Sequence, residues 1–303
     1  MLIKISADLK KEEIYANGAE LANIMGMDRK NGKRVISYPL EKSVFVHSFK
    51  NPVLLTDNYK ISKLNPTKRD TLFSLFSGRP RIVEYDGVSV IDKSYHPSVW
   101  CPSIDTVLFA RGLKKLFAKR KKFNKVIEIG TGSGFLSKFI LEKNKEVKTI
   151  VVNDLNNFAV DCAKDNIKDK RAILHTGDGI KKLNVDKYDL IICNPPYIPR
   201  PKSIDETPYE GVSLLYDLIH NYKKYLNKNG ILITNISSLC ESIVIDKSLK
   251  FNVIDKMEVP LKVNNVLNNK NWIKYLESKG LKKQFKEGYE YWQTLKIVVL
   301  ENN

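Results

Sequence analysis

From about residue 103 to its C-terminal end, the sequence alternates between short apolar runs and stretches with helical periodicity. The periodicity predicts helices over residues 106–119, 135–143, 157–166, 212–226 and 271–279. The apolar runs predict strands over residues 125–129, 149–153, 172–175, 188–193, 230–235, 252–259 and 295–300. Such alternation favours an α/β fold with a doubly wound, mostly parallel sheet, in which any antiparallel strand lies at the end.

The first 78 residues form a distinct region with a different texture. Its patterns predict helices near residues 12–25 and 68–76, and short strands over residues 34–38, 43–49 and 52–56. Asp86-Gly87 then separates two apolar runs, which predicts a tight β-hairpin over residues 81–91. We therefore expect an N-terminal α+β extension for substrate recognition over residues 1–78, a connecting hairpin over 79–95 and the main domain over 96–303.

Asn194-Pro195-Pro196-Tyr197 directly follows the apolar run 188–193. Two prolines fix φ and stiffen the exit from the strand, at the sheet edge where α/β folds bind ligands. There, Asn194 Oδ1 and the Pro195 carbonyl could each accept one N–H of a planar amino group, while Tyr197 lies against its flat face. Taken alone, the tetrapeptide is as compatible with a stiff exit turn that carries an incidental asparagine as with this amine-binding site.

A glycine-rich turn, Glu128-Ile-Gly130-Thr131-Gly132-Ser-Gly134, separates the first predicted strand of the main domain from its helix. Glycines at this point allow a tight turn and a close approach of a ligand to the helix N-terminus. An acid two residues before the first glycine would repel a pyrophosphate, but it suits a ligand that carries an ammonium group. The turn therefore points to S-adenosyl-L-methionine rather than to NAD.

Two acids follow the next two predicted strands. Asp154 is placed to accept both ribose hydroxyls of the cofactor, and its alternative role is an N-cap for the helix near residue 157. Asp178 is placed to accept the adenine amino group, and its alternative role is that of a turn residue. The expected cofactor-binding residues are Glu128, Gly130, Thr131, Gly132, Gly134, Asp154, Asp178, Gly179 and Asn194. The expected catalytic residues are Asn194, Pro195, Pro196 and Tyr197.

In their order along the chain, these motifs resemble those of class I S-adenosyl-L-methionine-dependent methyltransferases that modify amino or amide nitrogens. Residues 80–235 further resemble the protein-glutamine N5-methyltransferases that act on peptide-chain release factors, the HemK/PrmC type. That likeness is carried by Ile198 after the tetrapeptide, by Glu210-Gly-Val-Ser-Leu-Leu215, by the hairpin, and by Val99-Trp-Cys-Pro102-Ser-Ile-Asp105-Thr106. It implies a seven-stranded Rossmann-like methyltransferase sheet.

The sequence departs from that family in two regions. Bacterial members begin with a helical bundle, whereas residues 30–60 here have a β-rich pattern, and residues 237–290 are longer and more irregular than expected. Both regions are expected to bear on the choice of substrate.

The chain carries a formal charge of +17, mostly from lysines, and only residues 114–125 form a dense basic run. This run is compatible with a solvated helix face or with an RNA-rich partner. The four cysteines are scattered without a Cys-x-x-Cys pair, so no metal site is indicated. No apolar run approaches the roughly 20 residues that span a bilayer, and the N-terminus lacks a signal-peptide pattern. We therefore expect a cytoplasmic protein without a membrane partner.

Three functions remain open from the sequence. The leading one is methylation of a protein glutamine amide, with a translation release factor as the partner. The second is N6-methylation of adenine in RNA or DNA, because the same residues could grip a flipped base. The third is a scaffold that binds S-adenosyl-L-methionine without catalysis, against which the tetrapeptide argues. Histidines 47, 96, 175 and 220 are isolated in the sequence, which fits a reaction without a histidine base.

Overall fold

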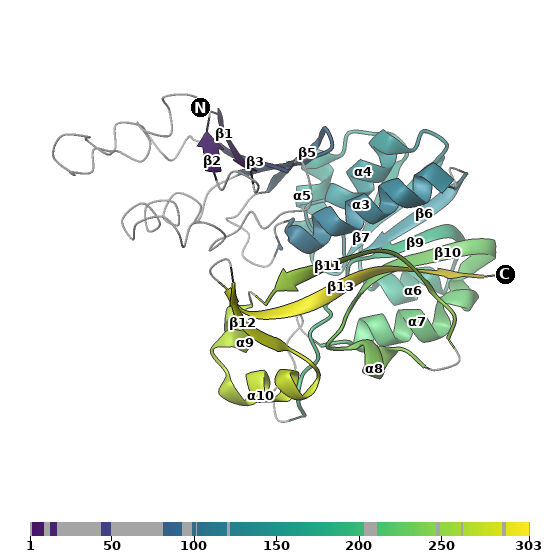
Figure 1. Cartoon of the computed structure of the whole chain (residues 1–303). Coiled ribbons are helices and arrows are strands. Elements are labelled where there is room, and N and C mark those ends of the chain that lie inside the picture. Colours follow the sequence, from purple (N-terminus) through teal and green to yellow (C-terminus); the bar gives the residue numbers. More distant parts are fainter. Residues whose placement is uncertain are drawn as a thin grey trace, which may run out of the picture.

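The computed structural model describes residues 2–8, 13–16, 44–49, 81–92, 99–100, 102–119, 122–202, 211–246, 249–261, 263–286 and 289–302, the first three ranges by their backbone only. These residues form a large sheet covered by helices on both faces, and a smaller sheet that includes the N-terminal strands (Figure 1).

The large sheet runs in the order β11-β13-β10-β9-β6-β7-β8, and β12 pairs with β13 outside this path. Its strands are β6 (Lys125–Ile129), β7 (Thr149–Asp154), β8 (Ala172–Thr176), β9 (Tyr188–Cys193), β10 (Leu226–Ser237), β11 (Asn252–Pro260), β12 (Lys282–Lys286) and β13 (Tyr289–Glu301). The pairings among β6, β7, β8, β9 and β10 are parallel, whereas β13 is antiparallel to both of its neighbours in the path. The prediction of a seven-stranded, mostly parallel sheet is therefore confirmed.

Helices cover the two faces of this sheet through two separate apolar clusters. The first face carries α3 (Ile104–Lys119), α4 (Phe135–Lys143) and α5 (Asn157–Asn166), and the second carries α6 (Gly179–Leu183), α7 (Ser213–Tyr225) and α8 (Glu241–Val244) (Figure 1). Strand residues alternate between these faces. The first cluster includes Leu190, Ile192, Ile231 and Ile233. The second includes Ile191, Cys193, Leu232 and Ile236. Side chains at odd positions of β10 and at even positions of β9 therefore point toward α3.

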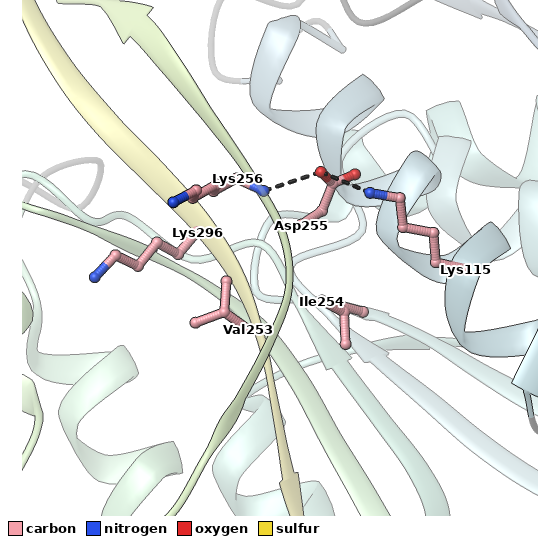
Figure 2. Close-up of a pocket in the computed structure, with 6 residues that line it drawn as sticks. All are labelled: Lys115, Val253, Ile254, Asp255, Lys256 and Lys296. Carbon is pink, nitrogen blue, oxygen red and sulfur yellow. Dashed lines mark hydrogen bonds and ion pairs between the residues drawn. The ribbon is translucent and has the colours of Figure 1, made fainter.

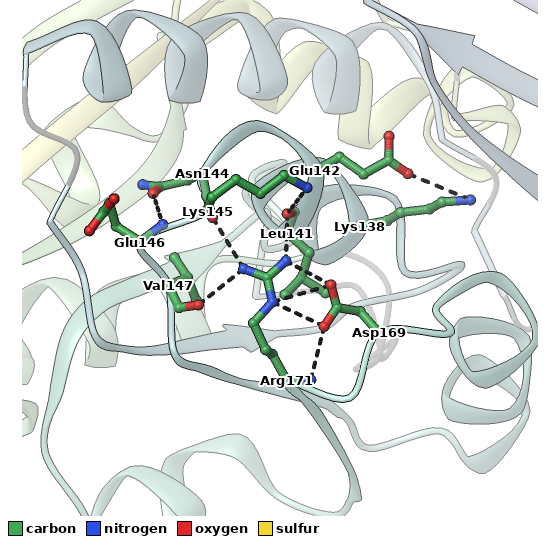
Figure 3. Close-up of polar contacts among 9 residues, drawn as sticks. All are labelled: Lys138, Leu141, Glu142, Asn144, Lys145, Glu146, Val147, Asp169 and Arg171. Atoms are coloured by element: carbon green, nitrogen blue, oxygen red, sulfur yellow. Dashed lines mark hydrogen bonds and ion pairs between the residues drawn. The ribbon is translucent and has the colours of Figure 1, made fainter.

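One arginine connects the C-terminal end of α4 to the segment before β8 (Figure 3). Arg171 donates to the carbonyl oxygens of Leu141 (2.7 Å) and Val147 (3.0 Å), and it forms a two-pronged ion pair with Asp169. A cation at a helix C-terminus satisfies carbonyls that have no partner within the helix. The hydrogen bonds from Arg171 lower the pKa of Asp169 to about 2. This contact therefore holds the end of α4 against the start of β8.

The predicted hairpin is present. β4 (Arg81–Tyr85) and β5 (Val88–Asp92) pair antiparallel around Asp86 and Gly87, which both have positive φ. The hairpin closes a five-stranded sheet in the order β2-β1-β3-β4-β5. Its buried side chains, including Tyr85, belong to the same apolar cluster as α3 and α4. The hairpin therefore joins the small sheet to the helices of the large one, and the boundaries proposed at residues 78 and 95 stay predictions.

The N-terminal predictions had mixed outcomes. β3 (Val44–Phe49) confirms the strand expected at 43–49. The helix expected at 12–25 is wrong over Glu13–Ala16, which form β2, because these residues pair antiparallel with β1 (Leu2–Asp8). β1 itself was not predicted. The strands expected at 34–38 and 52–56, and the helix expected at 68–76, lie outside the described residues.

The C-terminal region adds a small unit beside the large sheet. After β11 come α9 (Asn264–Leu267), α10 (Lys270–Ser278) and β12, of which only α10 matches a predicted element. Together with Ile198, this unit forms a third apolar cluster around Leu239, Leu261, Trp272 and Leu276. The long region 237–290 thus packs against the segment that follows Asn194-Pro195-Pro196-Tyr197.

Candidate active site

All four predicted motifs lie at one edge of the large sheet. In the parallel register, Ile129 pairs with both Asn153 and Cys193, and Asp154 pairs with Thr176. The residues that follow these strands therefore leave the sheet side by side. The structure brings together the glycine turn, Asp154, Asp178 and Asn194 at the carboxyl ends of the strands, where open α/β sheets bind ligands.

The glycine turn after β6 has a backbone that side chains would disfavour. Gly130, Gly132 and Gly134 have φ values of 74°, 55° and 83°, in the region where only glycine is relaxed. A Cβ atom on Gly134 would lie 3.0 Å from Ala163 of α5, so this glycine allows two helices to pack. A Cβ atom on Gly130 would meet nothing within 4 Å. One side of the turn is therefore open to a ligand.

Hydrogen bonds tie this turn to β7. The backbone N–H groups of Gly130 and Thr131 donate to the carbonyl oxygen of Asn153, each at 3.0 Å. The N–H of Gly132 donates to Asp154 Oδ2 at 2.9 Å. The turns that follow β6 and β7 are therefore one connected unit.

Glu128 lies beneath the turn and is 2% exposed. Its Oε2 accepts hydrogen bonds from Thr131 Oγ1 (2.7 Å), from the Ser137 N–H (3.0 Å) and from Ser137 Oγ. Burial raises the pKa of this carboxyl to about 7, against the hydrogen bonds that lower it. Oε1 accepts no hydrogen bond from the described residues, so one oxygen orders the turn and the other is available to a cationic ligand.

Asp154 is held by both neighbouring turns. Its Oδ1 accepts from the Asn156 N–H at 2.9 Å, and its Oδ2 accepts from Gly132. Burial raises its pKa despite these hydrogen bonds. Asn156, whose side chain accepts from the Phe158 N–H, is the N-cap of α5. The alternative role of Asp154 as that cap is therefore wrong.

Asp178 lies at the N-terminus of α6, after the turn that follows β8. Its Oδ1 accepts from the N–H groups of Ile180 (2.9 Å) and Lys181 (3.3 Å), so it is the N-cap of this helix. The side chain is exposed, and Oδ2 accepts no hydrogen bond from the residues that the structure describes. Gly179, the first residue of the helix, is buried against Asn153 and Ile129. Asp178 thus combines a cap with an open oxygen at the ligand edge.

The Asn194 side chain is held in one orientation. Its Nδ2 donates at 3.0 Å to Oδ2 of Asp105, which lies in the first turn of α3. Its Oδ1 is buried and has no hydrogen-bond partner in the described part of the chain. The Pro195 carbonyl likewise accepts no hydrogen bond from the described residues. Buried polar atoms are nearly always paired. Two acceptors without a donor, on adjacent residues, therefore fit a ligand with two N–H groups.

Tyr197 and Ile198 anchor the segment after the prolines. The half-buried Tyr197 packs against all three apolar clusters, and burial together with Asp105 raises the pKa of its hydroxyl well above the usual value. Ile198 is buried in the third cluster, and Trp272 Nε1 of α10 donates to the Pro199 carbonyl at 2.9 Å. The C-terminal unit therefore packs against the segment that follows Asn194-Pro195-Pro196-Tyr197 and supports it.

Asp105 and Trp272 were not among the predicted site residues. The segment that contains Asp105 was noted for its family resemblance, but nothing local showed that its carboxylate contacts an amide 89 residues away. Trp272 lies 73 residues from Pro199 in a region without a recognised motif. Both contacts depend on the tertiary fold.

A separate surface hollow lies where α3 faces β11 and β13 (Figure 2). It has a volume of about 470 Å³ and is lined by Lys115, Val253, Ile254, Asp255, Lys256 and Lys296. Its Asp255 is already paired with Arg111 and Lys115, and Lys296 is paired with Glu241. The hollow shares no residue with the predicted motifs and offers no unpaired buried group.

Within the described ranges, no helix is long and apolar enough to cross a membrane. The same ranges hold no group of three or more histidine, cysteine or acidic side chains arranged to bind a metal ion. Cys162, Cys193 and Cys240 are buried and form no disulfide within the part of the chain that the structure describes.

The chain is similar in sequence to known methyltransferases. A protein of Methanocaldococcus jannaschii, provisionally named a protein N5-glutamine methyltransferase, is 30% identical over 202 residues, which cover 62% of this chain and 98% of that protein. The release factor glutamine methyltransferase of Streptococcus pneumoniae is 35% identical over 110 residues, which cover 36% of this chain and 37% of that protein. The match thus spans nearly all of the first relative and little more than a third of the second.

Among solved structures, the ribosomal protein L11 methylase of Lactobacillus delbrueckii is 18% identical, with a TM-score of 0.40 over 72% of this chain and 84% of that one. Residues 104–272, more than half of the chain, match the family model of the methyltransferase small domain. The chain belongs to this family of S-adenosyl-L-methionine-dependent methyltransferases.

Proposed function

We propose that the protein methylates the side-chain amide nitrogen of a glutamine in a protein, and that a peptide-chain release factor is the substrate. One observation carries the proposal: Asn194 has its Nδ2 bound by Asp105 and its buried Oδ1 without a partner. The amide therefore presents an acceptor, and it is set for a ligand that donates. The amide nitrogen of glutamine carries two N–H groups, one for Asn194 Oδ1 and one for the Pro195 carbonyl.

The neighbouring turns fit S-adenosyl-L-methionine. The open side of the glycine turn would accommodate its methionine part, whose ammonium group suits Glu128, and Asp154 would accept from the ribose hydroxyls. Asp178 Oδ2 would accept from the adenine amino group. When bound, the cofactor supplies a methyl group on a positively charged sulfur. Every other contribution in this proposal comes from side chains and carbonyls of the chain.

The residues after β9 act by positioning the acceptor. An amide nitrogen is a poor nucleophile because its lone pair is delocalised into the carbonyl group. Hydrogen bonds from both N–H groups would favour a pyramidal nitrogen and aim its lone pair into the cofactor site. Positioning of this kind can supply a large part of a rate enhancement. The stiff Pro195-Pro196 backbone and the anchored Tyr197 would keep the two acceptors in place.

The relatives support the nature of the acceptor. Both the Methanocaldococcus and the Streptococcus proteins are named for glutamine methylation, and the second for release factors. Because release factors work on cytoplasmic ribosomes, the proposed place of action is the cytoplasm. We assign substrate selection to residues 1–78, together with the C-terminal unit. Residues 79–95 form the hairpin that connects this region to the catalytic domain, which we assign to residues 96–303.

The test is transfer of a radiolabelled methyl group to total protein and total RNA, with protease and nuclease controls. The proposal predicts label that protease removes and nuclease spares, and mass spectrometry should locate it on a glutamine side chain. The Asn194→Ala variant serves as the matched control and should transfer none. Label that only nuclease removes would contradict the proposal and indicate adenine methylation. In that case the protein should bind RNA through several phosphates, and this binding should weaken steeply with added salt.

A further inference from the structure

A second amide near the carboxyl ends of the strands is buried and has no hydrogen-bond partner among the described residues. Asn235 of β10 is 0% exposed, and neither its Nδ2 nor its Oδ1 forms a hydrogen bond with any of these residues. A buried side-chain amide normally satisfies most of its donors and acceptors. An amide that satisfies none destabilises the fold. Its retention at this position therefore calls for a functional explanation.

The sheet register places Asn235 beside Asn194. Strands β9 and β10 are parallel, and Cys193 pairs with Thr234, so the next residue of each strand is an asparagine. Leu190 and Ile192 of β9 belong to the first apolar cluster, and so do Ile231 and Ile233 of β10. By the two-residue alternation of strands, Asn194 and Asn235 both point to the face that carries α3.

The surroundings on that face leave Asn235 dependent on a ligand. On the opposite side, its strand neighbour is Ile297 of β13, a fully buried apolar side chain. On the near side is Asn194, whose Nδ2 is bound to Asp105 and whose Oδ1 is unpaired. Near the carboxyl ends of β9 and β10, two neighbouring side chains are therefore unpaired among the described residues. Asn194 offers a hydrogen-bond acceptor, and the Asn235 amide can both donate and accept.

We propose that Asn235 is a second acceptor-binding residue, and that its Nδ2 donates to the carbonyl oxygen of the amide that is methylated. This inference rests on the proposed function. A primary amide offers N–H donors and one carbonyl acceptor, which match Asn194 and Asn235 respectively. A hydrogen bond to the carbonyl fixes the plane of the amide. It also favours carboxamides over alkylamines, which lack that oxygen.

The experiment compares the wild type with Asn235→Leu, a change that keeps the branching at Cγ and removes the polar atoms. The glutamine-bearing protein identified by the labelling assay is the substrate. We expect kcat/KM for this substrate to fall by about 100-fold, because a site built to hydrogen-bond a substrate loses that contact. Affinity for S-adenosyl-L-methionine, measured by calorimetry, should stay within about 3-fold, since the cofactor turns are untouched. The melting temperature should rise, because the unpaired amide is gone.

Two results would overturn the assignment. An Asn235→Leu protein that transfers methyl groups as fast as the wild type would show that the amide is not used. A lower melting temperature together with weaker cofactor binding would show a purely structural role. Failure of the proposed function has a different signature, because the wild type itself would then transfer no label to protein. In that case the proposed hydrogen bond between Asn235 and the substrate carbonyl would be rejected together with the proposed function.

Discussion

The cofactor side and the acceptor side of the site treat their polar side chains in opposite ways. On the cofactor side, Glu128, Asp154 and Asp178 each accept at least two hydrogen bonds from their own turns. On the acceptor side, Asn194 Oδ1 and both polar atoms of Asn235 are buried and unpaired. Asn153 Oδ1 and Ser133 Oγ are unpaired atoms on the cofactor side, but neither belongs to a carboxylate.

This difference indicates how the two ligands are recognised. The carboxylates of the cofactor side shape three connected turns before any ligand arrives, so that side is organised in advance. The acceptor side keeps buried groups without a partner among the described residues, and we propose that the bound acceptor satisfies them. Leaving a buried group unpaired typically costs about 1–3 kcal/mol. Substitutions on the two sides should therefore separate binding and stability from methyl transfer.

The largest effect is expected for Asn194→Ala. Methyl transfer should fall by about 10³-fold or more, because the acceptor nitrogen loses a hydrogen bond at the reacting centre. The folded state should lose only about 1–3 kcal/mol of stability, because the variant removes the hydrogen bond from Nδ2 to Asp105, whereas the deleted oxygen has no partner among the described residues. Single-turnover transfer and urea unfolding measure the two quantities. Residual transfer near the wild-type rate would show that Asn194 is only part of an exit turn.

The next effect concerns Glu128, whose pKa in the folded protein is raised to about 7. A raised pKa contributes stability that is fully present below the unfolded pKa and is lost as the pH rises through about 7. For a shift of this size the contribution is roughly 3 kcal/mol. The stability of Glu128→Gln relative to the wild type should therefore improve by about that amount between about pH 4 and pH 8. Urea unfolding at several pH values measures it, and a pH-independent difference would contradict the expectation.

Asp154→Ala should affect both cofactor binding and the fold. The N–H groups of Gly132 and Asn156 would lose their acceptor, at a cost of about 1–2 kcal/mol of stability. Affinity for S-adenosyl-L-methionine should fall by about 10- to 100-fold, because the ribose hydroxyls lose their partner. Asp154→Asn retains one acceptor oxygen, so its affinity for S-adenosyl-L-methionine should lie between those of the wild type and Asp154→Ala. Calorimetry that finds unchanged affinity would remove the ribose role.

The smallest effect is expected for Asp105→Ala. Without its carboxylate, Asn194 Nδ2 loses its partner and the amide can rotate, so transfer should fall by about 10-fold. Cofactor affinity should not change. Asp105→Asn is the matched control, because its carbonyl oxygen can still accept from Nδ2, and it should retain most activity. Equal losses in both variants would indicate that charge, not orientation of the amide, is what Asp105 supplies.

The large sheet could be predicted because its signals are local. Apolar runs of four to eight residues predicted the strands, and the Gly130–Gly134 turn predicted the first strand-to-helix connection. The errors occurred where pairing with a neighbouring strand, and not the residue pattern of the segment itself, decides the structure. Glu13–Ala16 form a strand because β1 pairs with them. Polar β12 is a strand because it pairs with β13.

The same distinction applies to the site. Asp154, Asp178 and Asn194 could be named from the sequence because each follows a recognisable strand, and the fold places all three at one edge. The contacts of Asp105 and Trp272, and the role that we propose for Asn235, could not be identified from the sequence, since they depend on a helix position, a docked C-terminal unit and the register of β9 with β10. Local sequence carries no information on any of these contacts.

We infer that the acceptor side works separately from the cofactor side. The calorimetric affinity of Asn194→Ala for S-adenosyl-L-methionine, measured beside its transfer rate, tests this separation. We expect an affinity within about 3-fold of the wild type, because among the described residues no hydrogen bond joins the Asn194 amide to a cofactor turn. The rate of methyl transfer should fall by about 10³-fold or more. An affinity that falls as much as the rate would show that the two sides are not separate.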